Sequence, residues 1–333
     1  MKKILGIALV IAMVFSMVGC GSAKKETVKL GMGVLSYVNG YVDADDLNNG
    51  SADVVTTVAA VMLDKEGKVV ACELDTLDAA LEFTFEGAAV AVEGLKTKGE
   101  MGTDYGMVAY GGAVKEWNEQ ADAFEEVVVG KNLEEVKALL GENYYNGNEE
   151  VIEAGCTIGV ADFVSAVVMA IENAEESAAT AEDTLKIALV SKVTGEDASE
   201  EADGSQELEV NVAVVALNKD GKVAVAKVDT LSASVSFDMK GVYTGNTEYA
   251  ELSTKGMLGA NYNMATYGAD LNGDGVVKEW FEQADAFEAA CAGKTASEIS
   301  GLVSEGYGVE DVQKAGCTIA ISGLVNAVVK AIG

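Results

Sequence analysis

A five-residue motif that occurs twice carries the side chains best suited to chemistry. Ala-Gly-Cys-Thr-Ile occupies 154–158 and returns at 315–319, each time before an apolar stretch. Its glycine permits a left-handed turn. Its threonine stands where a helix N-cap would accept a backbone N–H. The free N–H groups at the start of a helix can also hold a phosphate. The alternative is a cap beside a buried thiol, because cysteine is among the most buried residues. The site residues of the first interpretation are Gly155, Cys156, Thr157, Gly316, Cys317 and Thr318.

Aromatic side chains and lysines recur along with this motif. Tyr105, Met107, Tyr110 and Trp117 return as Tyr262, Met264, Tyr267 and Trp280. Such residues form either a wall on which a flat ligand stacks or part of a shared core. Lys98 and Lys255, each in Thr-Lys-Gly, either meet a phosphate, since the chain has no arginine, or are solvated loop charges. The two Asp-Thr-Leu aspartates, Asp75 and Asp229, are explained as well by turn capping as by a site.

The composition excludes several classes of function. The chain has 23 Lys+Arg residues, all of them lysine, against 54 Asp+Glu, and it contains no histidine. A chain this acidic lacks the basic face that nucleic acids require, so no nucleic-acid partner is expected. Without histidine, zinc hydrolysis and Ser-His-Asp chemistry are excluded. No cysteine pair has the CxxC spacing of a structural zinc site.

The N-terminus has the features of an export signal. Two lysines precede an apolar run that is too short for a comfortable membrane span and that ends in Met-Val-Gly-Cys. This pattern resembles a bacterial lipoprotein signal peptide at 1–20, followed by a linker at 21–27. The resemblance implies that Cys20 is diacylated and holds the protein at the extracytoplasmic face of the cell membrane. The alternative is a plain secretory signal with an incidental cysteine.

Internal similarity divides the remaining chain into two copies of one domain. The matching stretches are 63–77 with 217–231, 97–111 with 254–268, 114–124 with 277–287, and 130–139 with 293–302. We expect repeats at 28–173 and 184–333, joined by a linker at 174–183 that continues a helix and then loosens. The fold class predicted for each copy is α+β, with an antiparallel sheet built on a β-hairpin and helices packed against it.

Local patterns indicate the individual elements. Val-rich arms that break at Asp-Lys-Glu-Gly are typical of a β-hairpin, and the alternating stretches 81–87 and 235–241 are predicted to form the next strand. Capping boxes are predicted at Asn132 with Glu135 and at Thr295 with Glu298. Apolar helical stripes are predicted at Trp117, Ala121 and Phe124, and then at Phe163, Val167 and Ala170, or Leu324, Val328 and Ala331.

These patterns together resemble the FMN-binding domain of flavin-carrying reductase subunits and bacterial surface flavoproteins. The hairpin of that family turns at Asp-Lys-Asp-Gly-Lys, and its Ser-Gly-Ala-Thr motif precedes a helix with Ala-Val nine and ten residues after the threonine. Here Ala-Gly-Cys-Thr stands for that motif, and Ala-Val follows at the same spacing. In the family the threonine can carry FMN through a phosphoester bond, which implies Thr157 and Thr318 as the matching positions. The serine is replaced by Ala154 and Ala315.

The chain also resembles surface lipoproteins of anaerobic Gram-positive bacteria. Together these resemblances imply a lipid-anchored protein that binds a flavin or related small molecule and relays electrons to a redox partner, without being a stand-alone enzyme. The competing hypothesis is a non-catalytic surface or substrate-binding module whose flavin sites have degenerated.

A segment found only in the second copy resembles the first half of a calcium loop. In 270–281, Asp270, Asn272 and Asp274 take the first, third and fifth positions of such a loop, but Phe281 stands where the bidentate acid belongs. The sequence therefore indicates either a weak calcium site or an Asn-Gly-Asp-Gly turn.

Overall fold

The computed structural model describes residues 26–248, 250–268 and 276–333. The expected signal peptide with Cys20 lies outside the described residues, as do Asp270, Asn272 and Asp274. Within the described part of the chain, no helix is long and apolar enough to cross a membrane.

The first sheet is an antiparallel meander with one added strand. Its strands are β1 (Thr27–Val42), β2 (Gly50–Leu63), β3 (Val69–Phe83) and β4 (Glu175–Thr180), in the order β3-β2-β1-β4. The Val-rich arms favour the extended backbone, because β-branched side chains pack well on a pleated surface. Almost every residue of β2 is buried, which requires cover on both faces of the sheet.

The second sheet repeats the meander without a fourth strand. It consists of β5 (Thr184–Glu196), β6 (Gly204–Leu217) and β7 (Val223–Phe237), in the order β5-β6-β7. Its register matches the first sheet, because Leu217 pairs with Val223 as Leu63 pairs with Val69, and each pair sits beside a register shift. A short two-stranded ribbon, β8 (Val303–Ser304) and β9 (Tyr307–Gly308), lies farther along the chain.

Helices follow each meander in corresponding order, and the second set has one additional short helix, α7. After β3 come α1 (Lys98–Met101), η1 (Gly102–Tyr105), α2 (Trp117–Val128), α3 (Leu133–Lys137), α4 (Glu149–Ala154) and α5 (Ala161–Glu172). After β7 come α6 (Lys255–Leu258), η2 (Gly259–Tyr262), α7 (Met264–Tyr267), α8 (Trp280–Cys291), α9 (Ala296–Ser300), α10 (Glu310–Lys314) and α11 (Ser322–Ile332).

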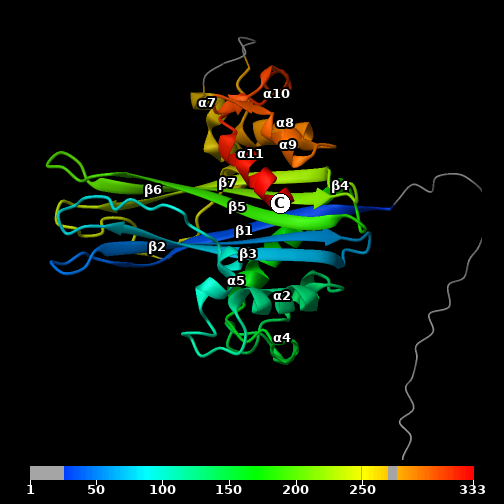
Figure 1. The fold of residues 1–333 in the computed structure, drawn as a ribbon, viewed down its shortest axis with the longest axis horizontal. Coiled ribbons are helices and arrows are strands. Elements are labelled where there is room, and N and C mark those ends of the chain that lie inside the picture. Colours follow the sequence, from blue (N-terminus) through cyan, green and yellow to red (C-terminus); the bar gives the residue numbers. More distant parts are fainter. Residues whose placement is uncertain (1–25, 249, 269–275) are drawn as a thin grey trace, which may run out of the picture.

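The two sheets pack face to face, and each set of helices covers the outer face of its own sheet (Figure 1). The core between the sheets contains side chains of both, and at one point Phe83 of β3 stacks on Phe237 of β7 with ring centroids 4.6 Å apart. Separate cores join each sheet to its helices, and they include the expected helical stripes. The resulting order of layers is helix, sheet, sheet, helix.

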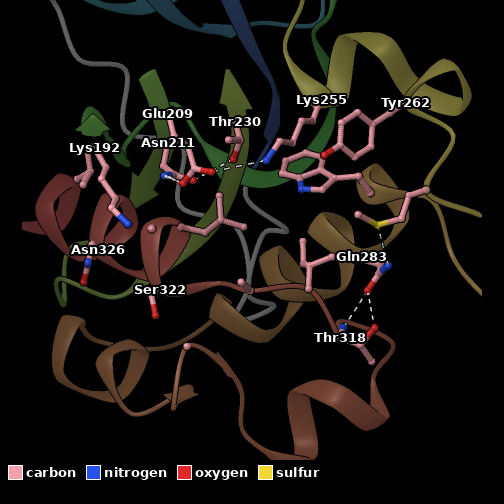
Figure 2. Close-up of a pocket in the computed structure, with 18 of the residues that line it drawn as sticks. Lys192, Glu209, Asn211, Thr230, Lys255, Tyr262, Gln283, Thr318, Ser322 and Asn326 are labelled. Carbon is pink, nitrogen blue, oxygen red and sulfur yellow. Dashed lines mark hydrogen bonds and ion pairs between the residues drawn. The ribbon is translucent and has the colours of Figure 1, made fainter. Parts of the chain in front are cut away.

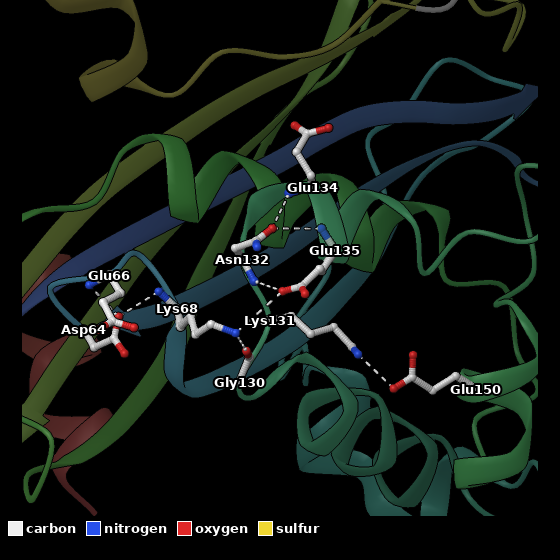
Figure 3. Close-up of polar contacts among 9 residues, drawn as sticks. All are labelled: Asp64, Glu66, Lys68, Gly130, Lys131, Asn132, Glu134, Glu135 and Glu150. Carbon is white, nitrogen blue, oxygen red and sulfur yellow. Dashed lines mark hydrogen bonds and ion pairs between the residues drawn. The ribbon is translucent and has the colours of Figure 1, made fainter.

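Polar contacts connect the β2–β3 hairpin to the helices of the first half (Figure 3). Asp64 Oδ1 accepts the N–H groups of Glu66 at 2.8 Å and Lys68 at 2.9 Å, which closes the turn between β2 and β3. Lys68 Nζ then donates to the carbonyl of Gly130 at 3.0 Å, just before Asn132 caps α3. Asn218 closes the turn between β6 and β7 in the same way. The Asp-Lys-Glu-Gly stretch is therefore explained by turn formation.

Of the predictions about the secondary structure and the linker, several are confirmed and two are wrong. The structure is α+β with antiparallel sheets, the hairpins form, and both capping boxes are present at Asn132 and Thr295. The stretches 81–87 and 235–241 are not separate strands, because β3 and β7 run on through Phe83 and Phe237 before turning.

The predicted linker at 174–183 contains a strand instead of a helical continuation. β4 pairs antiparallel with β1, Ala179 is buried, and Ser177 Oγ donates to the carbonyl of Val28 at 2.7 Å. The small side chains of this segment let it lie against the open edge of the first sheet, and this tertiary pairing outweighs its helical composition.

Candidate functional site

A cavity of about 670 Å³ lies between the second sheet and its helices. Its walls come from β5, β6, β7, α6, α8, α11 and the segment 318–320. Figure 2 shows Lys192 and Asn326 toward one end, Lys255 and Tyr262 toward the other, and Gln283 beside Thr318. Cavities of this size are typical of small-molecule sites.

A row of hydrogen bonds and one ion pair forms the strand side of the cavity. Thr230 Oγ1 donates to Asn211 Oδ1 at 2.9 Å, and Asn211 Nδ2 donates to Glu209 Oε1 at 3.0 Å. The other oxygen of Glu209 lies 3.7 Å from the ammonium of Lys255. The row of four side chains connects three elements, β6, β7 and α6, so each side chain has a fixed orientation.

A buried aspartate positions Lys255. Asp229 accepts hydrogen bonds from Thr254 Oγ1 at 2.5 Å, from the N–H of Gly256 at 2.8 Å and from the N–H of Thr230 at 2.7 Å. Burial raises the pKa of Asp229, while these three donors lower it. The same clamp joins Asp75 to Thr97 in the first half. In each half the aspartate of Asp-Thr-Leu thus binds the threonine and glycine of Thr-Lys-Gly. This contact was not predicted from the sequence, where turn capping was considered for this aspartate.

The aromatic wall is smaller than the sequence suggested. Lys255 lies over the ring of Tyr262, 5.9 Å from its centroid, and Trp280 lines the cavity while only 4% exposed. Tyr110 and Tyr267 are 92% and 84% exposed, so neither the core nor the ligand-wall interpretation holds for them.

The threonines of the repeated motif do not cap the following helices. Thr318 donates both its N–H, at 2.8 Å, and its hydroxyl, at 2.9 Å, to Oε1 of Gln283. The helix α11 begins only at Ser322, with Ile321 as its N-cap residue. In the first half, Thr157 makes the same pair of bonds to Gln120. The N-cap prediction is therefore wrong, because the helix begins farther along the chain and a buried glutamine, from α2 in the first half and from α8 in the second, accepts both donor groups.

The missed residues, Gln120 and Gln283, leave a signal in the sequence. Both stand in Glu-Gln-Ala-Asp-Ala-Phe, a stretch that occurs in each half of the chain, and both are buried, with exposures of 1% and 4%. A glutamine in the apolar face of a helix needs hydrogen-bond partners, and that requirement could have identified it.

Of the remaining residues of the motif, the cysteines belong to the core, the glycines form turns, and Ala154 and Ala315 are exposed. Gly155 and Gly316 have φ values of 103° and 106°, so the predicted left-handed turn is confirmed. Cys156 and Cys317 are fully buried, each in the core of its own half, and burial raises the pKa of each thiol to about 11. These four residues do not line either cavity of the two sheet–helix layers.

The matching cavity in the first half is smaller, at about 290 Å³. The β-sheet register places Tyr37 opposite Val55, where Lys192 stands opposite Glu209. The hydroxyl of Tyr37 donates to Asp162 Oδ2 at 2.6 Å across this cavity. The ring of Tyr145 lies against Gly159, where the second half has Gly306 in place of the tyrosine.

The structure therefore brings the predicted residues together unequally. Thr318, Lys255, Tyr262, Met264 and Trp280 share the larger cavity, whereas of their first-half counterparts only Lys98 and Trp117 line the smaller one. There Lys98 forms an ion pair with Asp78 at 2.8 Å and lies 5.4 Å from the ring centroid of Tyr105. Both lysines are thus ion-paired, with side chains only 17% exposed, and are not solvated loop charges.

No family model, curated protein or solved structure matches the chain. In the described residues, no group of three or more cysteine and acidic side chains could hold a metal ion.

Proposed function

We propose that this protein is a lipid-anchored, extracytoplasmic binding protein whose second half holds a flavin or a related planar anionic ligand, in the manner of an electron carrier. The cavity between the second sheet and its helices is the observation that supports this proposal. Its volume suits such a ligand, Tyr262 and Trp280 offer apolar rings, and Lys192 and Lys255 offer cations at separate ends.

We further propose that the chain consists of two tandem copies of one domain. The two halves share their order of strands and helices, their sheet register and the paired contacts of Asp229 with Thr254 and Gln283 with Thr318. An arrangement of so many parts is explained most simply by duplication, followed by divergence of the cavities.

Reversible binding suits these contacts better than a covalent bond. The hydroxyl and N–H of Thr318 already donate to Gln283, so neither is directed at a phosphate. A phosphoester at Thr318 would have to break the bonds of this half-buried threonine to Gln283, and a buried group such as the Gln283 amide costs about 1–3 kcal/mol when it loses its partner. The cations of the cavity, above all Lys255, would hold the anionic group instead. When bound, the flavin would supply the redox chemistry and the protein its position.

The test is a titration of the purified mature protein with FMN, in which quenching of the flavin fluorescence reports binding. We expect one bound FMN per chain, and a mass after denaturation that equals that of the lipidated polypeptide alone. Lys255→Met should weaken binding about tenfold or more, since a hydrogen bond to a charged group contributes about 1.5–3 kcal/mol.

The matched control is Lys98→Met, which makes the corresponding change in the closed first half. Its affinity for FMN should equal that of the wild type. If Lys98→Met and Lys255→Met weaken binding equally, the second-half cavity is not the site. If the wild-type protein does not bind FMN at all, the non-catalytic surface or substrate-binding module is the better interpretation, and the cavity then holds another small molecule.

A further inference from the structure

A second large cavity, of about 720 Å³, lies at the seam between the two halves. One wall comes from β1, the end of α5 and the start of β4, and the other comes from β7, α6 and α8. The proposed flavin site does not require this cavity, which is formed only because both halves are present.

The lining of the seam cavity combines apolar and acidic side chains. Met32, Met169, Met257 and Phe281 supply apolar surface, while Glu172, Glu175, Asp285 and Glu288 supply carboxyl groups. Among the described residues that line it, Lys227 is the only lysine, 2.8 Å from Glu175 and 3.9 Å from Glu288. Glu172 lies 3.8 Å from Lys137, outside the cavity. Carboxyl groups thus outnumber ammonium groups around an apolar interior, which suits a cation with an aliphatic body.

The other seam between the halves contains such a cation already. Lys330 of α11 donates to the carbonyl of Leu189 at 2.7 Å and forms an ion pair with Glu100 of α1 at 2.5 Å. The ammonium of one half is therefore held by the strand edge of its own half and by a carboxylate of the other.

Sequence matching identifies the residues that replace this contact at the cavity. Ala-Val-Val-Met-Ala-Ile at 166–171 matches Ala-Val-Val-Lys-Ala-Ile at 327–332, so Met169 stands for Lys330. Thr-Lys-Gly-Met at 254–257 matches Thr-Lys-Gly-Glu at 97–100, so Met257 stands for Glu100. Both methionines line the cavity, together with Val34, which matches Leu189 in the sheet register. At one seam the side chain of Lys330 occupies the space between the halves. At the other seam the corresponding space is the cavity lined by Met169 and Met257.

We infer that the seam cavity binds a small aliphatic amine, whose ammonium and alkyl chain take the place that Lys330 occupies in the other seam. Burial raises the pKa of Glu288 to about 8, so the carboxylates of Glu172, Glu175 and Asp285 attract the ammonium, and the methionine and phenylalanine side chains cover the alkyl chain. A net charge of −31 on the chain strengthens the attraction of any cation to this surface.

The experiment is isothermal titration of the full-length mature protein with 1,5-diaminopentane at physiological ionic strength. We expect one site per chain. The double variant Met169→Lys with Met257→Glu rebuilds the filled seam, and it should weaken binding at least tenfold. The net charge of this variant equals that of the wild type, so a loss of binding cannot result from a change in overall charge.

The reverse double variant provides an independent readout. Glu100→Met with Lys330→Met also keeps the net charge, and it should open the second seam and raise the number of bound amines from one to two. A parallel titration with Nα-acetyl-lysine N-methylamide identifies the source of the ammonium, because equal affinity would indicate a lysine of a polypeptide rather than a free amine.

The inference is overturned if the wild type binds no diamine at millimolar concentration. It is also overturned if the variant with Met169→Lys and Met257→Glu, still folded by its melting temperature, keeps the affinity of the wild type. Should that variant not fold, an unchanged stoichiometry of one in the reverse variant overturns the inference as well.

Discussion

Replacing Glu125 with glutamine should remove a large part of the pH dependence of stability. The Glu125 side chain comes from α2 and lies against β3, where its Oε1 accepts the N–H of Leu74 at 2.8 Å. Burial is the main cause that raises the pKa of this carboxyl from 4.5 to about 8, and the nearby Glu73 and Asp122 raise it further. The hydrogen bond from Leu74 and the ammonium of Lys186 lower the pKa, but by less.

The sign of the effect follows from the raised pKa. The folded protein binds this proton more tightly than the unfolded chain, so the stabilisation is fully present below pH 4.5 and is lost as the pH rises through about 8. A pKa difference of one unit between the folded and unfolded states corresponds to about 1.4 kcal/mol, so the change from 4.5 to about 8 amounts to about 4–5 kcal/mol of unfolding free energy. A glutamine keeps an acceptor for Leu74 and cannot ionise, and so it imitates the protonated state.

The assay is urea unfolding of the wild type and of Glu125→Gln at pH 5 and pH 8.5. We expect the wild type to lose more stability than the variant between these pH values, by several kcal/mol, and the variant to be the more stable protein at pH 8.5. Glu126→Gln, a neighbour on the same helix, is the matched control and should follow the wild type. The reasoning fails if Glu125→Gln and the wild type lose equal stability, because the carboxyl would then be ionised in the folded protein throughout.

Two further predictions concern the cysteines. Cys20→Ala should release the protein from the membrane or leave it unprocessed, and partitioning into the detergent phase in Triton X-114 measures this; unchanged partitioning would refute the lipid anchor. Cys156 and Cys317 should react with Ellman's reagent only slowly in the folded protein at pH 7, because both are buried and burial raises the pKa of each thiol to about 11. A tryptic peptide pair joined through these two residues would contradict this.

The sequence predicted local features well because their causes are local. The turns at Asp64 and Asn218, the capping boxes at Asn132 and Thr295, and the left-handed glycines each depend on residues within a few positions. The helical stripes were also correct, since a period of 3.6 residues fixes which side chains face the sheet. Long-range contacts were not predicted in the same way.

The errors arise where a distant partner decides the outcome. Thr318 looks like an N-cap until Gln283, which is 35 residues earlier in the chain, accepts both of its donors. The composition of residues 175–180 favours a helix, but in the structure they form β4 and pair antiparallel with the edge strand β1. The packing of the two sheets against each other was not predicted either, because a buried strand has the same apolar pattern whether a sheet or a helix covers it.

The differences between the two halves separate framework from function. The contacts present in both halves, such as Asp229 with Thr254 and Gln283 with Thr318, hold strands and helices together in each half. The cavities differ where matched residues differ: Tyr37 with Asp162 crosses the cavity of the first half, whereas Lys192 and Gly323 line an open one in the second. The Ala-Gly-Cys-Thr-Ile motif is repeated because the fold needs it in each half. The sites for ligands are expected instead where the two halves differ.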